Sequence, residues 1–297
     1  MRRPPRLLTL TIVAASLTAV ACAEERRFGG FVGVDKASDL LADPAAVLLE
    51  VGTDREAFGA SHIQGARFLS FGSIVEDVDG VPNQLPPVER LDSVFEAVGV
   101  SDGSAVVVYG PPLRAARAAM TLASLGFGER TYILEGDVEA WVAAGGSSET
   151  GVPETAPGTL TPAPADDLIV EADWVAARLD APGVRLLDAR PPEQHTGEVA
   201  GDGVERPGHI PGSIPFWWEE MTDGTEPLDL REAAELRARF AERGFESGDT
   251  VVTYCRTGVQ ASMAWAVAEA LGYETRIYDA SFTDWSRRAT LPITGPQ

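Results

Sequence analysis

The segment Thr250–Leu271 (TVVTYCRTGVQASMAWAVAEAL) joins a short β-branched run to an Ala-rich stretch through a loop that begins with Cys255. The run Val251–Tyr254 predicts a buried strand, and the stretch from Ala261 to about Leu271 predicts an amphipathic helix. A similar segment, AVVVYGPPLRAARAAMTLASLGF from Ala105, occurs about 145 residues earlier. The chain therefore contains a strand, loop and helix that occur twice.

The repeat continues on the amino-terminal side of both segments. The first copy reads VLLEVGTDREAFGASHIQGARFL from Val47, and the second reads RLLDARPPEQHTG from Arg185 and RPGHIPGSIPF from Arg206. Strands alternate with helices, which we expect also at Leu91–Ala97 and Leu230–Arg243. This alternation predicts an α/β fold with two units, each a mostly parallel sheet flanked by helices on both faces.

The segment between the two copies, Gly145–Asp167 (GGSSETGVPETAPGTLTPAPADD), is rich in Gly, Pro, Ser and Thr and has no apolar period. This composition indicates an interdomain linker. We therefore expect a first domain at residues 31–144, a linker at 145–167 and a second domain at 168–297.

The composition excludes several classes of function. The 297 residues are 44% hydrophobic and 23% charged, as in an ordinary globular protein of about two domains. The formal charge of -21 would repel a phosphate backbone, so nucleic acid is not an expected partner. Two cysteines, Cys22 and Cys255, and three histidines are too few for a disulfide framework or a cysteine- or histidine-rich metal site. We expect chemistry without a metal or cofactor.

The first 21 residues have the pattern of a secretory signal peptide. A basic n-region precedes the apolar stretch Leu7–Ala21, and Ala19-Val20-Ala21 forms a small-residue cleavage site, so we expect the protein to be exported. Cys22 follows at once, and Ala-Val-Ala-Cys resembles a bacterial lipobox whose cysteine is acylated. Two outcomes stay open: a lipoprotein of the bacterial cell envelope anchored through Cys22, or a periplasmic or secreted protein cleaved after Ala21.

Cys255 lies where α/β sheets usually bind ligands, just beyond the carboxyl end of a strand. The loop Cys255–Gln260 leads into a helix whose free N–H groups and dipole favour an anion. Arg256 adds a positive charge, and Gly258 permits the tight turn that a cradle of N–H groups needs. These features favour a reactive thiolate over the alternative, a small buried apolar side chain.

These residues together resemble the tandem-domain rhodaneses, or thiosulfate sulfurtransferases. Cys255–Val259 looks like the Cys-Arg-x-Gly-Val active loop of thiosulfate-specific members, and Asp188-Ala189-Arg190 and Arg206–Gly212 (RPGHIPG) look like the family's other hallmarks. The resemblance covers about residues 31–292 and implies two rhodanese-like domains, of which only the second is catalytic. In agreement, Gly110 stands where Cys255 would fall in the first copy, and Pro111-Pro112 lack the N–H groups of a cradle.

The resemblance implies covalent sulfur transfer. The Cys255 thiolate would take the outer sulfur of thiosulfate, release sulfite and hold a persulfide until cyanide or a thiol removes the sulfur. Arg256 is the leading candidate to hold the dianionic donor, and loop N–H groups would stabilise the persulfide. The other candidate donor-binding residues are Thr257, Gly258, Val259 and Gln260, together with Arg190 and Arg206.

Some of these positions also have a structural interpretation. Arg190 follows Asp188 by two residues and either binds the donor or pairs with that carboxylate. His209 has a counterpart, His62, in the copy that lacks the cysteine, so we expect His209 to fix a turn. For Trp217-Trp218 we expect packing rather than a place in the site.

Three other functions can be compared with the loop. A phosphatase or arsenate reductase would need an arginine six residues after the cysteine, where this chain has Ala261. A 3-mercaptopyruvate sulfurtransferase would resemble Cys-Gly-x-Gly, with glycine in place of Arg256, and is the nearest alternative. Thr257 departs from the lysine of some thiosulfate-using members, which leaves donor affinity open. A non-enzymatic carrier of sulfane sulfur is the third possibility.

Overall fold

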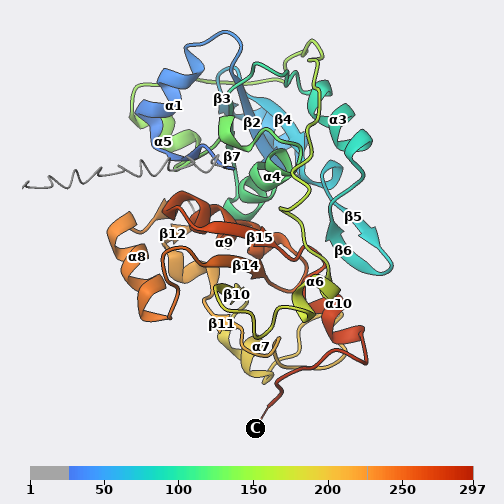
Figure 1. Ribbon diagram of the computed structural model, residues 1–297. Helices are drawn as coiled ribbons and strands as arrows, with labels where there is room; N and C mark the ends of the chain where they lie inside the picture. Colours follow the sequence, from blue (N-terminus) through green and yellow to red (C-terminus); the bar gives the residue numbers. More distant parts are fainter. Residues whose placement is uncertain (1–26, 226, 297) are drawn as a thin grey trace, which may run out of the picture.

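The computed structural model describes residues 27–225 and 227–296, so the expected signal peptide and Cys22 lie outside the described residues. Two α/β domains lie one above the other, with the amino-terminal domain at the top of Figure 1. No helix in the described ranges has the length and apolar character needed to cross a membrane.

The first domain is built on a five-stranded sheet in which every pairing is parallel. Its strands, in spatial order, are β1 (Gly30–Val32), β8 (Thr131–Leu134), β7 (Val106–Tyr109), β2 (Val47–Gly52) and β4 (Arg67–Ser70). Its helices are α1 (Val34–Leu41), α2 (Arg55–Ala60), α3 (Val88–Ala97), α4 (Pro112–Ser124) and α5 (Val138–Ala143), with 3₁₀ turns η1 (Phe71–Ser73) and η2 (Gly128–Arg130).

The second domain repeats this plan with a four-stranded parallel sheet. Its strands, in spatial order, are β11 (Ile214–Pro215), β10 (Val184–Asp188), β14 (Thr250–Tyr254) and β15 (Glu274–Ile277). Its helices are α6 (Ala172–Ala176), α7 (Pro192–Thr196), α8 (Ala233–Glu242), α9 (Val259–Leu271) and α10 (Ser281–Arg287), with the 3₁₀ turn η3 (Trp218–Met221). The prediction of two α/β units with mostly parallel sheets is confirmed.

Both faces of each sheet are buried because successive strand residues point to opposite sides. In β7, Val106 and Val108 join one apolar cluster, while Val107 joins another. In β14, Val251 and Val252 divide in the same way. Helices must therefore cover both faces, as Figure 1 shows.

The two domains share one of these clusters. Helix α4 of the first domain packs against helix α9 of the second, and Met120 and Trp265 from the two helices are fully buried in the same core. Both helices are rich in alanine, which allows a close approach. The helix that follows Cys255 is thus supported by the corresponding helix of the other copy.

Three short antiparallel pairs complete the structure: β3 (His62–Ile63) with β9 (Ser148–Glu149), β5 (Glu76–Val78) with β6 (Val81–Gln84), and β12 (Thr222–Thr225) with β13 (Leu228–Leu230). Because β9 lies in the segment expected as a linker, that segment is partly bonded to the first domain. Farther along it, the Ala163 N–H donates to the Leu125 carbonyl at 2.9 Å. The connection follows the surface of the first domain.

Candidate active site

Cys255 is the first residue after β14 and is only 1% exposed. Its N–H donates to Ser281 Oγ at 3.1 Å, and its carbonyl accepts from the Phe282 N–H at 3.0 Å. Both partners lie at the start of α10. The first two residues of α10 therefore hold the backbone of Cys255 in place.

The loop Cys255–Gly258 provides free backbone donors. No acceptor in the described part of the chain bonds the N–H groups of residues 256–260. Gly258 caps α9 at a φ of 88°, a left-handed conformation that glycine adopts without strain, and no side chain caps the helix. These N–H groups and the positive end of the helix dipole can stabilise an anion such as a thiolate or persulfide.

Arg190 is fully buried and pairs with Asp188 at the end of β10. Its Nε and Nη2 donate to the Asp188 carboxylate at 2.8 and 2.6 Å. Burial alone would raise the pKa of Asp188, but the guanidinium outweighs burial and holds that pKa at about 2. The carboxylate is therefore ionised at neutral pH, and the predicted pairing is observed.

The same guanidinium also lies near the nucleophile. Burial would lower the pKa of Arg190, but the Asp188 carboxylate raises it, and a negative charge on Cys255 adds to the rise. The Nη1 of Arg190 is buried and has no partner among the described residues. Arg190 can thus pair with Asp188 and still offer one nitrogen to an anion, and its role toward the donor stays a prediction.

Both copies have an acid–tyrosine pair at the strand ends. In the second copy the Tyr254 hydroxyl donates to Asp188 at 2.8 Å, and in the first copy the Tyr109 hydroxyl donates to Glu50 at 2.6 Å. The strand registers match, because Asp188 lies opposite Tyr254 and Glu50 opposite Tyr109. The pair belongs to the scaffold rather than to the chemistry.

The guanidinium of Arg190 and the thiol of Cys255 have no counterpart at the matching positions of the first copy. Gly52 stands in the first copy where Arg190 stands in the second, and Gly110 stands in place of Cys255. A Cβ at Gly110 would lie 2.8 Å from the Val51 carbonyl oxygen, which leaves no room for a thiol. Helix α4 also begins at Pro112, so the first copy has no extended loop.

The two histidines have matching structural contacts. His209 Nδ1 lies 2.8 Å from the His195 carbonyl oxygen, and the two imidazole rings stack with centroids 3.8 Å apart. His62 Nδ1 lies 2.9 Å from the Phe58 carbonyl oxygen, and its ring stacks on the Phe58 ring with centroids 3.9 Å apart. Burial lowers the pKa of His209, which keeps the ring neutral at pH 7. These contacts agree with the expectation that His209 fixes a turn, which stays a prediction.

Two other predicted donor-binding arginines have protein partners. Arg256 Nη1 donates to the Asp202 carbonyl at 3.0 Å and lies 3.7 Å from its carboxylate, with the side chain 34% exposed. Arg206 donates to four carbonyl oxygens, those of Trp285, Ser286, Arg288 and Leu291. These contacts tie Arg206 to the carboxyl-terminal segment. The donor-binding roles of Arg206 and Arg256 stay predictions.

Two further side chains near these residues, Gln194 and His195, were not singled out by the sequence. Gln194, on α7, has a buried Oε1 without a partner in the described residues, and a Cβ at Gly201 would approach both this atom and Arg256. His195 Nδ1 lies 2.9 Å from Asp188.

Trp218 is 7% exposed in the shared core, in line with the packing expected for it. Within the described ranges, no three His, Cys, Asp or Glu side chains are grouped as metal ligands.

The rhodanese-like domain family matches residues 33–144 and 171–288, so the chain belongs to this family and carries the domain twice. A thiosulfate sulfurtransferase of Azotobacter vinelandii is 28% identical over 85% of this chain and 92% of its own length. A sulfur carrier protein, TtuD, of Thermus thermophilus is 29% identical over 88% and 95%. A 3-mercaptopyruvate sulfurtransferase of Escherichia coli K12 is 27% identical over 89% and 97%.

A solved structure agrees with the fold. The crystal structure of SseA from Escherichia coli, described as a 3-mercaptopyruvate sulfotransferase, superimposes with a TM-score of 0.74 at 25% identity and covers 84% of this chain and 98% of that one. The chain is thus a tandem-domain rhodanese with the sulfurtransferase function of its family. The relatives carry names for two different donors.

Proposed function

We propose that this protein is a thiosulfate sulfurtransferase that transfers the outer sulfur of thiosulfate to cyanide or a thiol through a persulfide on Cys255. The observation that carries the proposal is that Cys255 begins a loop of free N–H groups, within electrostatic reach of Arg190, whose buried Nη1 has no partner among the described residues. The first copy has neither the thiol nor the guanidinium.

The reaction balances without an external oxidant or reductant. The Cys255 thiolate forms a bond to the outer sulfur of thiosulfate, the S–S bond of the donor breaks, and its electron pair leaves with sulfite. Cyanide then bonds to the terminal sulfur of the persulfide, thiocyanate departs and the Cys255 thiolate returns. The loop N–H groups stabilise the negative charge on the terminal sulfur.

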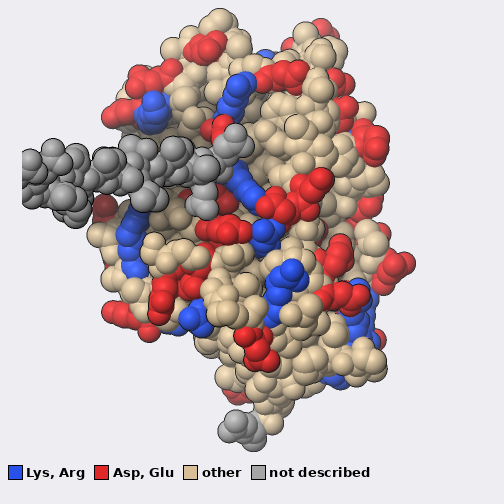
Figure 2. Space-filling model, in the orientation of Figure 1, with Lys and Arg blue, Asp and Glu red and all other residues tan. Residues whose placement is uncertain are grey.

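The surface makes local positive charge important for an anionic donor. The chain has 45 Asp and Glu against 24 Lys and Arg, and Figure 2 shows acidic side chains spread among basic ones on the face it presents. A dianion therefore needs a guanidinium close to the nucleophile. Arg256 is adjacent to Cys255 and partly exposed, so it can turn from Asp202 toward an incoming donor.

We expect Arg256→Gly to reduce kcat/KM for thiosulfate by about 10- to 100-fold, because a hydrogen bond to a charged group is worth roughly 1.5–3 kcal/mol. The kcat/KM for 3-mercaptopyruvate, which carries one carboxylate, should fall less or rise. The measurement is the ratio of the two efficiencies in the wild type and the variant. An unchanged ratio would remove Arg256 from the donor site.

The second candidate is a 3-mercaptopyruvate sulfurtransferase, which the name of the Escherichia coli relative favours. A higher wild-type kcat/KM with 3-mercaptopyruvate than with thiosulfate would select it. The third is a sulfane-sulfur carrier, which the name of the Thermus relative favours. A carrier would load one sulfur per Cys255 and then stop, whereas an enzyme continues to turn over.

We also propose that the protein is exported and anchored to the bacterial envelope through an acylated Cys22. A disulfide to Cys255 is the alternative fate of an exported cysteine, but Cys255 is buried, and the bond would consume the nucleophile. Mass spectrometry of the protein from its native membrane should find a lipid-modified amino terminus at Cys22. An unmodified amino terminus there, or a Cys22–Cys255 disulfide, would contradict this.

A further inference from the structure

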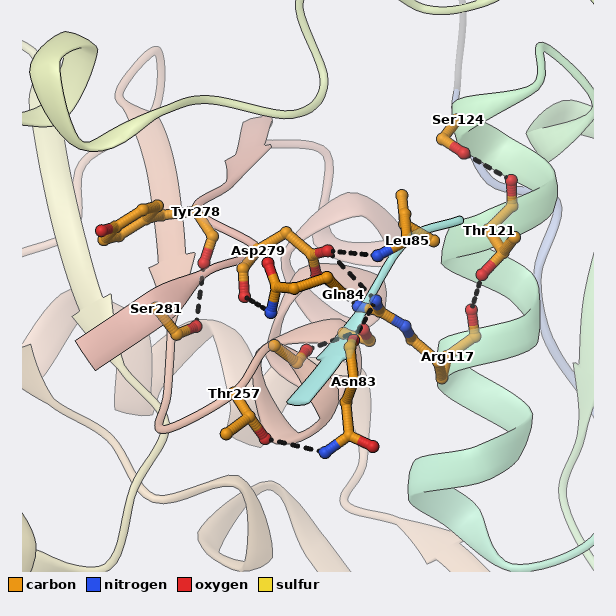
Figure 3. A network of polar contacts seen from close by, with 12 residues as sticks. Asn83, Gln84, Leu85, Arg117, Thr121, Ser124, Thr257, Tyr278, Asp279 and Ser281 are labelled. Atoms are coloured by element: carbon orange, nitrogen blue, oxygen red, sulfur yellow. Dashed lines mark hydrogen bonds and ion pairs between the residues drawn. The ribbon is translucent and has the colours of Figure 1, made fainter. Parts of the chain in front are cut away.

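The first domain contacts the catalytic loop directly. Asn83, in strand β6 of the β5–β6 hairpin, donates from Nδ2 to Thr257 Oγ1 at 3.1 Å (Figure 3). Thr257 is 5% exposed and lies two residues after Cys255. A side chain of the copy that lacks the nucleophile therefore reaches the loop that carries it.

The conformation of Asn83 is held by charged groups of both domains. Asn83 has a φ of 64°, a left-handed conformation that non-glycine residues adopt only where their surroundings stabilise it. Its carbonyl accepts from Arg117 Nη2 of helix α4 at 2.5 Å. Arg117, fully buried, also pairs with the Asp279 carboxylate between β15 and α10, and the Leu85 N–H donates to the same carboxylate at 2.9 Å.

This ion pair lies directly behind the catalytic loop. A Cβ placed at Gly258 would lie 2.8 Å from the Asp279 carbonyl oxygen and 3.0 Å from Arg117 Nη1. Gly258 can pass so close because it has no side chain. Figure 3 shows Arg117, Asp279, Asn83 and Thr257 around one point of contact between the domains.

The hydrogen bond from Asn83 also sets the direction of the Thr257 hydroxyl. Because Oγ1 accepts the amide N–H, the hydroxyl proton must point elsewhere. No acceptor for that proton occurs among the described residues. The hydroxyl is therefore available to donate to an anion in the loop that begins at Cys255.

We propose that Asn83, from the domain without a nucleophile, is a positioning residue for sulfur transfer. It turns the Thr257 hydroxyl toward the terminal sulfur of the Cys255 persulfide, and the Arg117–Asp279 pair holds Asn83 in the conformation that this requires. The inference rests on the proposed persulfide chemistry of Cys255. It assigns the first domain a part in catalysis besides its part in the shared core.

A double-mutant cycle tests this proposal through the rate constant of persulfide loading, measured as sulfite release in a single turnover. We expect Asn83→Ala and Thr257→Val each to slow loading roughly tenfold, the usual value of one hydrogen bond. The double variant should be no slower than Thr257→Val alone, since Asn83 acts only through the Thr257 hydroxyl. Thr257→Ser, which keeps the hydroxyl, should load faster than Thr257→Val.

Asn83→Asp separates orientation from packing. The carboxylate has nearly the same shape but only accepts hydrogen bonds, so it would draw the Thr257 proton away from the sulfur and slow loading more than Asn83→Ala does. Val78→Ala, an exposed change on the same hairpin, is the matched control and should load normally. Independent, multiplying losses in the double variant, or Asn83→Asp loading at the wild-type rate, would overturn the proposal.

If the wild type takes no sulfur from thiosulfate, the cycle is run with 3-mercaptopyruvate and pyruvate release is measured, since the hydroxyl acts on the terminal sulfur common to both reactions. Loss of coupling with the donor that does load Cys255 would overturn the role of Asn83 alone.

Discussion

Cys255→Ser is expected to abolish sulfur transfer while leaving the protein folded. The hydroxyl is a much weaker nucleophile than a thiolate, and it cannot form a persulfide. The substitution replaces sulfur with oxygen at a position next to unbonded N–H donors, so the buried hydroxyl can accept a hydrogen bond and its cost to stability should be about 1 kcal/mol or less. Steady-state thiocyanate formation and thermal unfolding measure the two effects.

The matched control lies in the other copy. Changing Gly110 to serine, at the position that corresponds to Cys255, should reduce stability, because a Cβ there would crowd the Val51 carbonyl. Persulfide formation at Cys255 should remain in the folded fraction. Appreciable thiosulfate turnover by Cys255→Ser would show that the nucleophile is elsewhere.

Arg117→Met is expected to lower the free energy of unfolding by about 3–5 kcal/mol, the usual cost of removing one partner of a buried ion pair. Arg117 is fully buried, and Asp279 is 5% exposed, so the carboxylate would be left without its counterion in the interior. Urea unfolding followed by tryptophan fluorescence measures the change. Loading of Cys255 should slow as well, because Asn83 loses the guanidinium on its carbonyl.

Arg114→Met, on the same helix but only half-buried, is the control and should change stability little. The double variant Arg117→Met with Asp279→Leu removes both charges and should recover part of the loss. If the free energy of unfolding of Arg117→Met were within about 1 kcal/mol of the wild-type value, the buried ion pair would not stabilise the contact between the domains.

The strand and helix around Cys255 could be predicted because their signals are local. A β-branched run, a glycine in the loop and an Ala-rich stretch define β14, the turn and α9 without help from the rest of the chain. The helix begins at Val259 rather than at the expected Ala261, since Gly258 in the left-handed conformation ends the loop earlier. Because the segment occurs twice, the same elements could be predicted in the first domain.

The contacts between the domains could not be predicted in this way. Arg117 is one arginine in an Ala-rich helix, and nothing near it in sequence indicates that it is buried or that its partner, Asp279, belongs to the other copy. Asn83 lies in a short hairpin, and nothing near it in sequence indicates a contact with Thr257 of the other copy. Such contacts depend on how two folded units meet, which local patterns do not encode.

The position of charged side chains was likewise decided by tertiary partners. The sequence leaves Arg190 either paired with Asp188 or bound to the donor, and the structure shows the pair, with the Nη1 of Arg190 unpartnered among the described residues. Arg206 is engaged by four backbone carbonyls of the carboxyl-terminal segment, a set that no short motif indicates. Local sequence patterns therefore place Cys255 at the strand end, but they do not show which groups its charged neighbours bind.

The most direct test of the central claim is mass spectrometry of the purified protein after incubation with thiosulfate and removal of the excess. The account predicts the added mass of one sulfur atom on the peptide that contains Cys255, together with one equivalent of sulfite, and loss of that mass as thiocyanate when cyanide is added. A protein that gains no sulfur, or gains it on a peptide without Cys255, would contradict the account.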